Sequence, residues 1–313
     1  MEILVGKTAG FCYGVQRAYK GSLKQTKNNN KIYCLGELVH NKQVVSELQE
    51  KGINFIENLD EIEEKKAKVI VRAHGVSKEI YERAKKEEIK IIDYTCPKVL
   101  KTHLIAEEYV EKGYYIILCG KKDHPEIIGT KSYCGDNFSI IENEEEIEEA
   151  LEKFNASNIE KILIMAQTTY SLKKFEMIQN KIKEKVGRNI KVVVNNTICK
   201  ATKLRQKETQ ELSKKVDCMI IIGGKNSSNT NKLYEIAKKN CKHAIHIETA
   251  EKVRSENIKH YGSIGVIAGA STPKKAICDV LKEIGVMVET STSKETIFKV
   301  IKELEDMECM SRI

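Results

Sequence analysis

One arrangement of apolar runs and polar turns occurs three times along the 313 residues of the chain, and it restricts the possible folds more than any other feature. In each copy an apolar run ends in a turn that carries a cysteine, and a helix-like stretch follows. Three further apolar runs come next, and they end in a glycine, an acidic residue and a polar turn. Because an ordered set of features that recurs at this length marks a repeated building block, the chain should contain three similar units. The cysteines are Cys12, Cys96 and Cys199, and the glycines are Gly36, Gly120 and Gly223.

The spacing of the copies is regular. Cys12 and Cys96 are 84 residues apart (96 − 12), and Cys96 and Cys199 are 103 apart (199 − 96). The glycines keep the same two intervals (120 − 36 and 223 − 120). Continuous apolar runs separated by helical stretches are typical of parallel sheets covered by helices. The sequence therefore predicts three similar α/β domains with small, mostly parallel sheets, arranged around a pseudo-threefold axis.

The repeat also predicts the domain limits. We expect α/β repeats at residues 1–96, 97–198 and 199–290, with Cys96 at the junction of the first two, and a helical tail at residues 291–313. Apolar residues in the tail have the spacing of an amphipathic helix, and they are Ile297, Val300, Ile301 and Leu304.

The three repeat cysteines are candidate ligands of one metal centre. In open parallel sheets, ligands bind beyond the carboxyl ends of the strands, where each of these cysteines follows an apolar run. Three thiolates leave a fourth coordination position open, as suits a [4Fe–4S] cluster with one unliganded iron or a zinc ion held by three cysteines. No C-x-x-C pair occurs, and Cys34, Cys119 and Cys218 lie inside apolar runs, so we expect those three to be buried.

Polar residues in the equivalent turns are candidates for substrate binding. His40, His74 and His124 each follow a strand end, and Glu126 lies two residues after His124. Burial near the metal centre should raise the pKa of Glu126, which suits a proton donor, although the position is also compatible with a surface glutamate.

The third repeat has a loop rich in hydroxyl and amide side chains instead of a histidine. Ser227, Ser228 and Asn229 precede a helix-like stretch, where free backbone N–H groups favour a phosphate group. Helix capping alone would explain part of this composition. Ser271 lies in the last polar turn of the same repeat, so the site should be polar and suited to a diphosphate.

Composition limits the class of protein. The formal net charge of +8 suits an anionic small molecule or an acidic protein partner, although solubility alone would explain it equally well. The chain has no Trp and no basic tract interleaved with aromatic residues, so nucleic-acid binding has little support. No run reaches the length of a membrane span and the N-terminus lacks a secretory signal, so we expect a cytoplasmic protein without a membrane partner.

The ordered motifs resemble those of the 4-hydroxy-3-methylbut-2-enyl diphosphate reductase family, also called LytB or IspH. The similarity extends from the Gly10–Val15 segment to the Ala268–Ser271 segment, which covers almost the whole chain. The motifs between these ends are Leu38–Asn41, Ala73–Ser77, Thr95–Pro97, His124–Glu126, Gln167–Thr169, Thr197–Thr202 and Lys225–Asn229. Many members carry Pro-Arg before the first Gly-Phe-Cys, whereas this chain has Thr8 and Ala9. That difference affects a loop contact and leaves the cysteine unchanged.

The resemblance implies a reductive dehydroxylation in the last step of the non-mevalonate isoprenoid pathway, which gives isopentenyl and dimethylallyl diphosphates. It implies one [4Fe–4S] cluster per chain, held by Cys12, Cys96 and Cys199, with the open iron taking the substrate hydroxyl. It implies electrons from ferredoxin or flavodoxin, and Glu126 as the proton source with His124 and Thr168 beside the substrate. It further implies a set of diphosphate-binding residues, namely His40, His74, Ser227, Ser228, Asn229 and Ser271.

Two other functions fit the cysteine pattern. A dehydratase with a three-cysteine [4Fe–4S] cluster would use the open iron without net electron transfer. An iron–sulfur sensor or RNA-binding protein would need no substrate pocket, so the Ser-Ser-Asn loop and Glu126 would then be replaceable.

Overall fold

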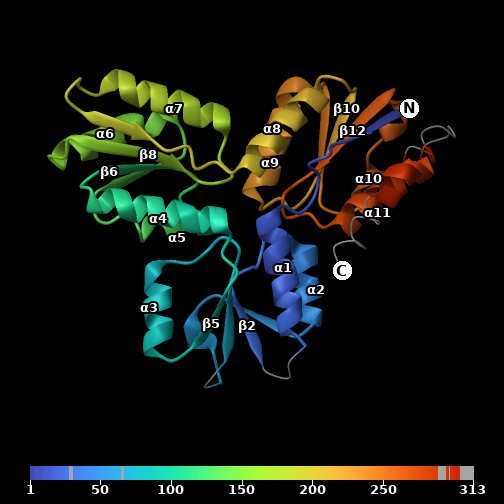
Figure 1. The fold of residues 1–313 in the computed structure, drawn as a ribbon. Coiled ribbons are helices and arrows are strands. Elements are labelled where there is room, and N and C mark those ends of the chain that lie inside the picture. The colour runs from blue at the N-terminus through green and yellow to red at the C-terminus, as the bar shows by residue number, and fades with distance from the viewer. Residues whose placement is uncertain (28–30, 65–66, 288–293, 296, 304–313) are drawn as a thin grey trace. The chain divides into compact units, whose positions relative to one another are not determined.

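The computed structural model describes residues 1–27, 31–64, 67–287, 294–295 and 297–303. It divides into two compact units. Figure 1 labels their helices and strands. The terminal unit comprises Met1–Cys12, His40–Val44 and the chain from Lys200 onward, and the inner unit comprises Tyr13–Val39 and Val45–Cys199. Among the described residues, no helix is long and apolar enough to cross a membrane.

The inner unit contains two four-stranded parallel sheets, with the strand orders β3-β2-β4-β5 and β7-β6-β8-β9. The strands of the first sheet are β2 (Ile32–Leu35), β3 (Ile53–Ile56), β4 (Lys68–Val71) and β5 (Lys90–Asp93). The strands of the second sheet are β6 (Tyr115–Cys119), β7 (Phe138–Ile141), β8 (Lys161–Ala166) and β9 (Lys191–Val194). The seven α-helices assigned to these two repeats are α1 (Tyr13–Gln25), α2 (Lys42–Glu50), α3 (Lys78–Lys86), α4 (Pro97–Glu111), α5 (Pro125–Lys131), α6 (Ile147–Ala156) and α7 (Leu172–Lys185).

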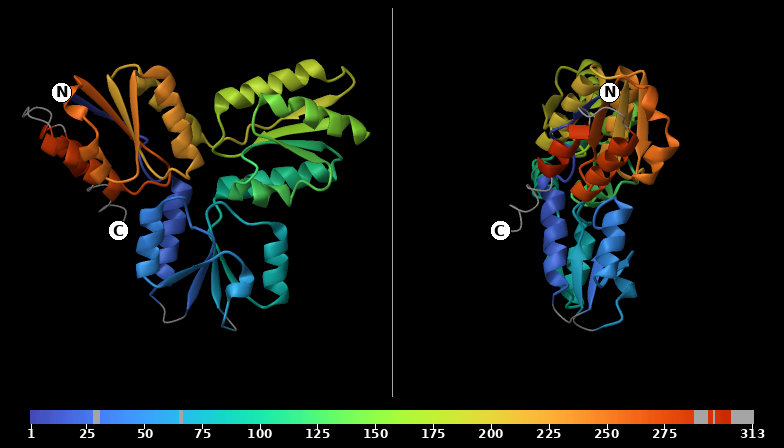
Figure 2. Two further views of the ribbon diagram at one scale, coloured as in Figure 1. Left: turned by 180° about the vertical axis from the view of Figure 1, so that it is seen from behind. Right: turned by 90° about the vertical axis from the view of Figure 1, so that its right-hand side faces the viewer.

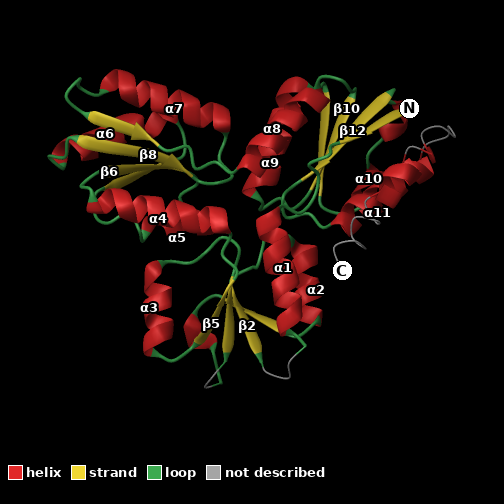
Figure 3. Ribbon diagram, in the orientation of Figure 1, coloured by secondary structure: helices red, strands yellow, loops and turns green. Residues whose placement is uncertain are grey.

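The terminal unit contains the third parallel sheet, with the strand order β1-β12-β10-β11. Its strands are β1 (Glu2–Val5), β10 (Cys218–Ile222), β11 (His243–Ile247) and β12 (Ser263–Ala268). Its helices are α8 (Lys200–Ser213), α9 (Ser228–Asn240), α10 (Glu251–Ser255) and α11 (Lys274–Met287). In Figures 2 and 3 helices cover both faces of each sheet, so the prediction of an α/β fold with three small parallel sheets is confirmed.

The position of β1 differs from its place in the sequence. Residues 1–96 are the predicted first repeat, yet β1 pairs in register with β12, with Ile3 opposite Ile264. The three sheets then share one order, because β5, β9 and β1 occupy the same edge position beside β4, β8 and β12. Each cysteine therefore follows an edge strand. The predicted domain limits and the threefold axis stay predictions.

Burial explains why the central strands have almost purely apolar sequences. Every residue of β6 and β10 is buried, since helices cover both faces, whereas the edge strands β5 and β9 are only partly buried. In the tail, residues 294–295 and 297–303 are helical. Ile297 and Ile301 join the core beneath β12 and α11, as their predicted spacing requires. Leu304 lies outside the described residues.

Candidate functional site

Each repeat cysteine directly precedes a helix. Cys96 is the N-cap of α4 with Pro97 in its first turn, as predicted, while Cys12 precedes α1 and Cys199 precedes α8. All three are partly exposed thiols. The remaining cysteines that the structure describes are buried, and they are Cys34, Cys119, Cys134, Cys218, Cys241 and Cys278. The expected burial of Cys34, Cys119 and Cys218 is therefore confirmed.

Two of the buried cysteines, Cys34 and Cys134, are held in the thiol form. The Cys34 Sγ donates to the Gly36 carbonyl at 3.3 Å, and the Cys134 Sγ donates to the Thr130 carbonyl at 3.4 Å. Burial raises the pKa of Cys34 and of Cys134 to about 12, because the thiolate would lose its hydration. Since a metal ligand must be a thiolate, the three partly exposed cysteines are the better donors.

The same backbone hydrogen bond holds each repeat cysteine against the polar turn of its own sheet. The Cys96 N–H donates to the Ala73 carbonyl at 3.0 Å, directly before His74. The Cys199 N–H donates to the Thr168 carbonyl at 2.9 Å. In the terminal unit the Cys12 N–H donates to the Ala270 carbonyl at 3.1 Å, directly before Ser271. Each cysteine thus lies beside one predicted substrate-binding residue.

Gly14, at the start of α1, leaves room for the Cys96 thiol. A Cβ atom on Gly14 would lie 2.5 Å from the Cys96 Sγ, which is far closer than two such atoms can approach. Only glycine therefore allows α1 and the Cys96 turn to approach each other in this way. Arg17, one turn further along α1, donates to the carbonyls of Asp93 and Thr95 at 3.3 and 3.1 Å and holds the same turn.

Glu126 is a buried carboxyl group that accepts hydrogen bonds from Thr168, in the polar turn after β8. Its side chain is 1% exposed. Its Oε1 accepts the Thr168 N–H at 2.6 Å and its Oε2 accepts the Thr168 hydroxyl at 2.7 Å. Burial raises the pKa of Glu126 to about 7, and the two bonds from Thr168 oppose that rise only in part. The group is therefore suited to hold and release a proton near neutral pH.

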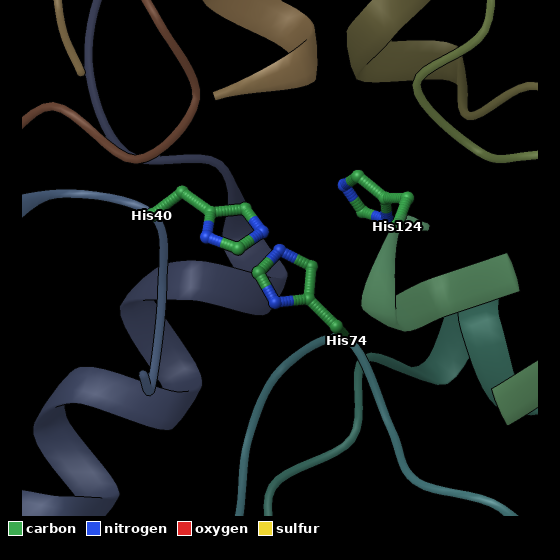
Figure 4. A group of neighbouring side chains, drawn as sticks. All are labelled: His40, His74 and His124. Atoms are coloured by element: carbon green, nitrogen blue, oxygen red, sulfur yellow. The ribbon is translucent and has the colours of Figure 1, made fainter. Parts of the chain in front are cut away.

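His124 and His74 lie next to one another at the same end of the inner unit. The two rings meet edge to face with centroids 5.2 Å apart (Figure 4). His124 is the N-cap of α5, and its Nδ1 accepts the Glu126 N–H at 3.1 Å. That bond fixes the ring orientation and leaves the proton of the neutral ring on Nε2. The inner unit therefore brings together Cys96, Cys199, His74, His124, Glu126 and Thr168 through the contacts described above.

In the terminal unit, the His40 backbone lies against the glycine turn of the third repeat. The Ser271 hydroxyl donates to the His40 carbonyl at 3.2 Å. A Cβ atom on Gly224 would lie 2.8 Å from the same carbonyl oxygen, so glycine is needed there too. His40, Ser271 and the turn before α9 therefore form one cluster, although they are more than 180 residues apart in sequence (224 − 40).

The predicted Ser-Ser-Asn loop forms the N-terminus of α9. Ser227 is the N-cap, and its hydroxyl accepts the Thr230 N–H at 3.3 Å, while Ser228 is the first helical residue. The Asn229 side chain is 3% exposed, and within the described part of the chain neither of its amide atoms has a hydrogen-bond partner. A buried amide without a partner costs free energy, so this position is suited to a polar ligand. Helix capping explains why a serine is present at position 227, but it does not explain the buried amide of Asn229.

Two residues of α8 that sequence reasoning missed hold the loop before Cys12. The Arg205 guanidinium donates to the Thr8 carbonyl, and to the Gly10 carbonyl at 2.8 Å. The Glu208 carboxylate accepts the Thr8 N–H at 2.9 Å and also the Thr8 hydroxyl. Thr8, where many resembling sequences have proline, thus uses an N–H that proline lacks. The signal in the sequence was slight: Arg205 is a charged residue on the buried face of α8.

Comparison with known proteins identifies one family for almost the whole chain. A family model described as LytB protein matches residues 3–285. The 4-hydroxy-3-methylbut-2-enyl diphosphate reductase of Thermoanaerobacter sp. (strain X514) is 46% identical over 288 residues, which cover 91% of this chain and 96% of that protein. The protein of the same description from Clostridioides difficile (strain 630) is 41% identical over 282 residues, which cover 90% and 98%.

Solved structures agree with the sequence comparison. A structure of (E)-4-hydroxy-3-methyl-but-2-enyl diphosphate reductase, described as the terminal enzyme of the non-mevalonate pathway, has 39% identity and a TM-score of 0.66, and the match covers 91% of this chain and 99% of that one. The corresponding reductase from Plasmodium falciparum has 30% identity and a TM-score of 0.81, with coverage of 91% and 87%. The chain therefore belongs to the LytB family, whose matched relatives are 4-hydroxy-3-methylbut-2-enyl diphosphate reductases.

Proposed function

We propose that this protein catalyses the reductive dehydroxylation of (E)-4-hydroxy-3-methylbut-2-enyl diphosphate. Two electrons and two protons are consumed: the C–O bond of the allylic alcohol breaks, the hydroxyl leaves as water, and a new C–H bond gives isopentenyl or dimethylallyl diphosphate. The observation that carries this proposal is the equivalent hydrogen bond from each repeat cysteine to a polar turn. It joins Cys199 to Thr168, and it joins Cys96 and Cys12 to the alanines that directly precede His74 and Ser271.

Cys12, Cys96 and Cys199 would hold a [4Fe–4S] cluster. Among the described cysteines they are the ones that are not buried, and Gly14 leaves room for the Cys96 Sγ. When bound, a cluster with three protein ligands supplies electrons and one iron with an open coordination position. Ferredoxin or flavodoxin would deliver the electrons, and such a donor and a reduced set of thiols suit the cytoplasm.

The polar residues would bind and orient the diphosphate. The proposed donors to the diphosphate are His40, His74, Ser227, Ser228, Asn229 and Ser271. The N–H groups at the start of α9 favour negative charge, and the unsatisfied amide of Asn229 would gain a partner. Hydroxyl, amide and imidazole groups can bind a diphosphate through hydrogen bonds without arginine or Mg²⁺.

Glu126 would supply the proton for the leaving hydroxyl, with Thr168 and His124 beside the substrate. Near neutral pH a substantial fraction of Glu126 is protonated, because burial raises its pKa to about 7. The Thr168 hydroxyl donates to the Glu126 Oε2, and it would accept the proton instead when Glu126 is protonated on that oxygen. His124, fixed by the Glu126 N–H, would present its Nε2–H as a donor.

The test is turnover by the anaerobic holoprotein, with Glu126→Gln as the decisive variant. Wild-type protein should form both products only when reduced methyl viologen is supplied. Glu126→Gln should keep the visible spectrum and the KM while kcat falls at least about 100-fold, which is the usual contribution of a general acid. Glu148→Gln, which removes an exposed carboxylate on α6 that pairs with Lys185, should retain full activity.

Other outcomes separate the alternatives. Conversion of the allylic diphosphate without a reductant would identify a dehydratase, and full activity of Glu126→Gln would remove Glu126 from the reaction. Iron and acid-labile sulfide at about four each per chain exclude a three-cysteine zinc site. A sensor would tolerate Asn229→Ala and Glu126→Gln together without loss of its response.

A further inference from the structure

A groove of about 440 Å³ lies along one side of α1 in the inner unit. Tyr13, Arg17, Lys20 and Lys24 line it from α1, and their spacing places them on one face of that helix. Tyr94, directly after β5, lines the opposite wall. Its ring packs so closely on the α1 backbone that no side chain would fit at Gly21. Tyr13 is 74% exposed, which is unusual for a large aromatic side chain.

The groove lies next to the turn that carries Cys96. Arg17, in its wall, donates to two backbone carbonyls of that turn. Gly14, about one turn before Arg17 on the same helix, lies against the Cys96 Sγ. Tyr13, which also lines the groove, directly follows Cys12 in the chain. Of the proposed cluster ligands, Cys96 is therefore close to this groove in space. Cys12 is adjacent in sequence to Tyr13, one of the lining residues.

The charged side chains that line the groove are all positive. Among the residues that line it, three are cations and none is a carboxylate. A second surface hollow, of about 320 Å³ in the terminal unit, has a net negative lining, since Glu251, Asp279 and Glu283 line it together with one cation, Lys282. The formal net charge of +8 is thus not spread evenly over these hollows, and an acidic protein would be attracted to the first and repelled by the second.

We infer that the α1 groove is the docking surface for the electron donor, and that this donor is a ferredoxin. This inference rests on the proposed function, which requires an external source of electrons. Ferredoxins are small proteins with an excess of Asp and Glu, so they complement Arg17, Lys20 and Lys24. Electron transfer slows steeply with distance, and docking here would place the donor beside the Cys96 turn. The exposed Tyr13 ring supplies the apolar contact that a small, transient interface needs.

The test is the affinity of the holoprotein for a purified ferredoxin, measured by isothermal titration calorimetry. The variant is Lys20→Glu with Lys24→Glu, because neither residue belongs to the proposed catalytic or binding machinery. We expect the Kd to rise at least about tenfold at low salt, and the difference to shrink as salt screens the charges. Turnover with reduced methyl viologen should stay within about twofold of wild type, since that small reductant needs no docking surface.

A matched control is Lys183→Glu with Lys239→Glu, which makes the same change in net charge on exposed positions of α7 and α9. An equal loss of affinity in both double variants, or no loss in the groove variant, would overturn the inference. Failure of the wild-type protein to bind ferredoxin would also overturn it. If the double variant does not fold, Lys24→Glu alone decides the matter. Absence of turnover with methyl viologen would instead count against the proposed function.

Discussion

Burial, rather than a neighbouring charge, sets the acidity of Glu126. The protonated form is favoured because the carboxylate would lose its hydration, and the two hydrogen bonds from Thr168 offset this only in part. A surface glutamate has an ordinary pKa of 4.5, whereas burial raises the pKa of Glu126 to about 7. The sequence pointed to this residue through its position after His124. The partner, Thr168, belongs to a different turn 42 residues away.

The shifted pKa predicts a pH dependence of stability. Between about pH 4.5 and 7 the folded protein holds a proton on Glu126 that the unfolded chain has released. The stability that depends on this proton is complete below pH 4.5 and is lost as pH rises through 7. Relative to wild type, Glu126→Gln should therefore become more stable as pH rises from about 5 to about 8, by up to about 3 kcal/mol. Denaturant unfolding at several pH values checks this, and a pH-independent difference would contradict it.

Gly14 gives a second prediction for a single residue. Gly14→Ala should push the Cys96 Sγ away, since the new methyl group would lie 2.5 Å from it. We expect lower iron and sulfide content after reconstitution and a weaker visible spectrum, with the helical circular dichroism retained. Gly285→Ala on α11 is the control, because its methyl group would meet only ordinary contacts at 3.7 Å. Equal cluster content in the two variants would show that Cys96 needs no such space.

Helix α8 has two structural roles that the residue pattern of its sequence does not indicate. It begins directly after Cys199, and through Arg205 and Glu208 it also holds the loop before Cys12. Periodicity identifies a helix from its apolar face, but α8 buries Thr202, Arg205 and Gln206 instead. The bonds from Arg205 end on backbone carbonyls about 195 residues away. No residue pattern near either partner could reveal them, because any residue supplies a carbonyl.

Arg205→Met should loosen the loop that carries Cys12. The guanidinium bonds to two carbonyls at once, and their loss should cost about 2–4 kcal/mol. Amide hydrogen exchange should accelerate in residues 6–12, and iron content should fall. Arg188→Met, at an exposed position, should change neither quantity. Unchanged exchange in residues 6–12 would show that Glu208 alone holds the loop.

At the scale of the whole molecule, the repeat predicted the three parallel sheets, and it did so because buried central strands leave long apolar runs in the sequence. It also selected, by position alone, the three partly exposed cysteines from the buried ones. The place of β1 could not be predicted in this way. Its residues Ile3 to Val5 are equally suited to the edge of any of the three sheets, and only packing in three dimensions selects β12.

Truncation of one strand residue in each unit tests this assignment. Ile3→Ala should cost about 2–4 kcal/mol, because Ile3 is 4% exposed and packs in the core of the terminal unit. Hydrogen exchange should accelerate in β10, β11 and β12. Ile53→Ala, at the equally buried first position of β3, should instead loosen β2, β4 and β5. Loss of protection in β2–β5 on Ile3→Ala would place β1 with the first repeat.

The pairing of β1 with β12 also has a consequence for synthesis on the ribosome. Ser263, the first residue of β12, is translated 258 residues after Val5 (263 − 5). At roughly 5–20 residues per second this delay is on the order of tens of seconds. The sheets β2–β5 and β6–β9 can be completed during that time, whereas Ile3 and its neighbours stay an unpaired apolar strand. Strand β1 is thus translated long before its partner β12, and a chaperone that binds nascent apolar segments would protect Glu2–Val5 during that time.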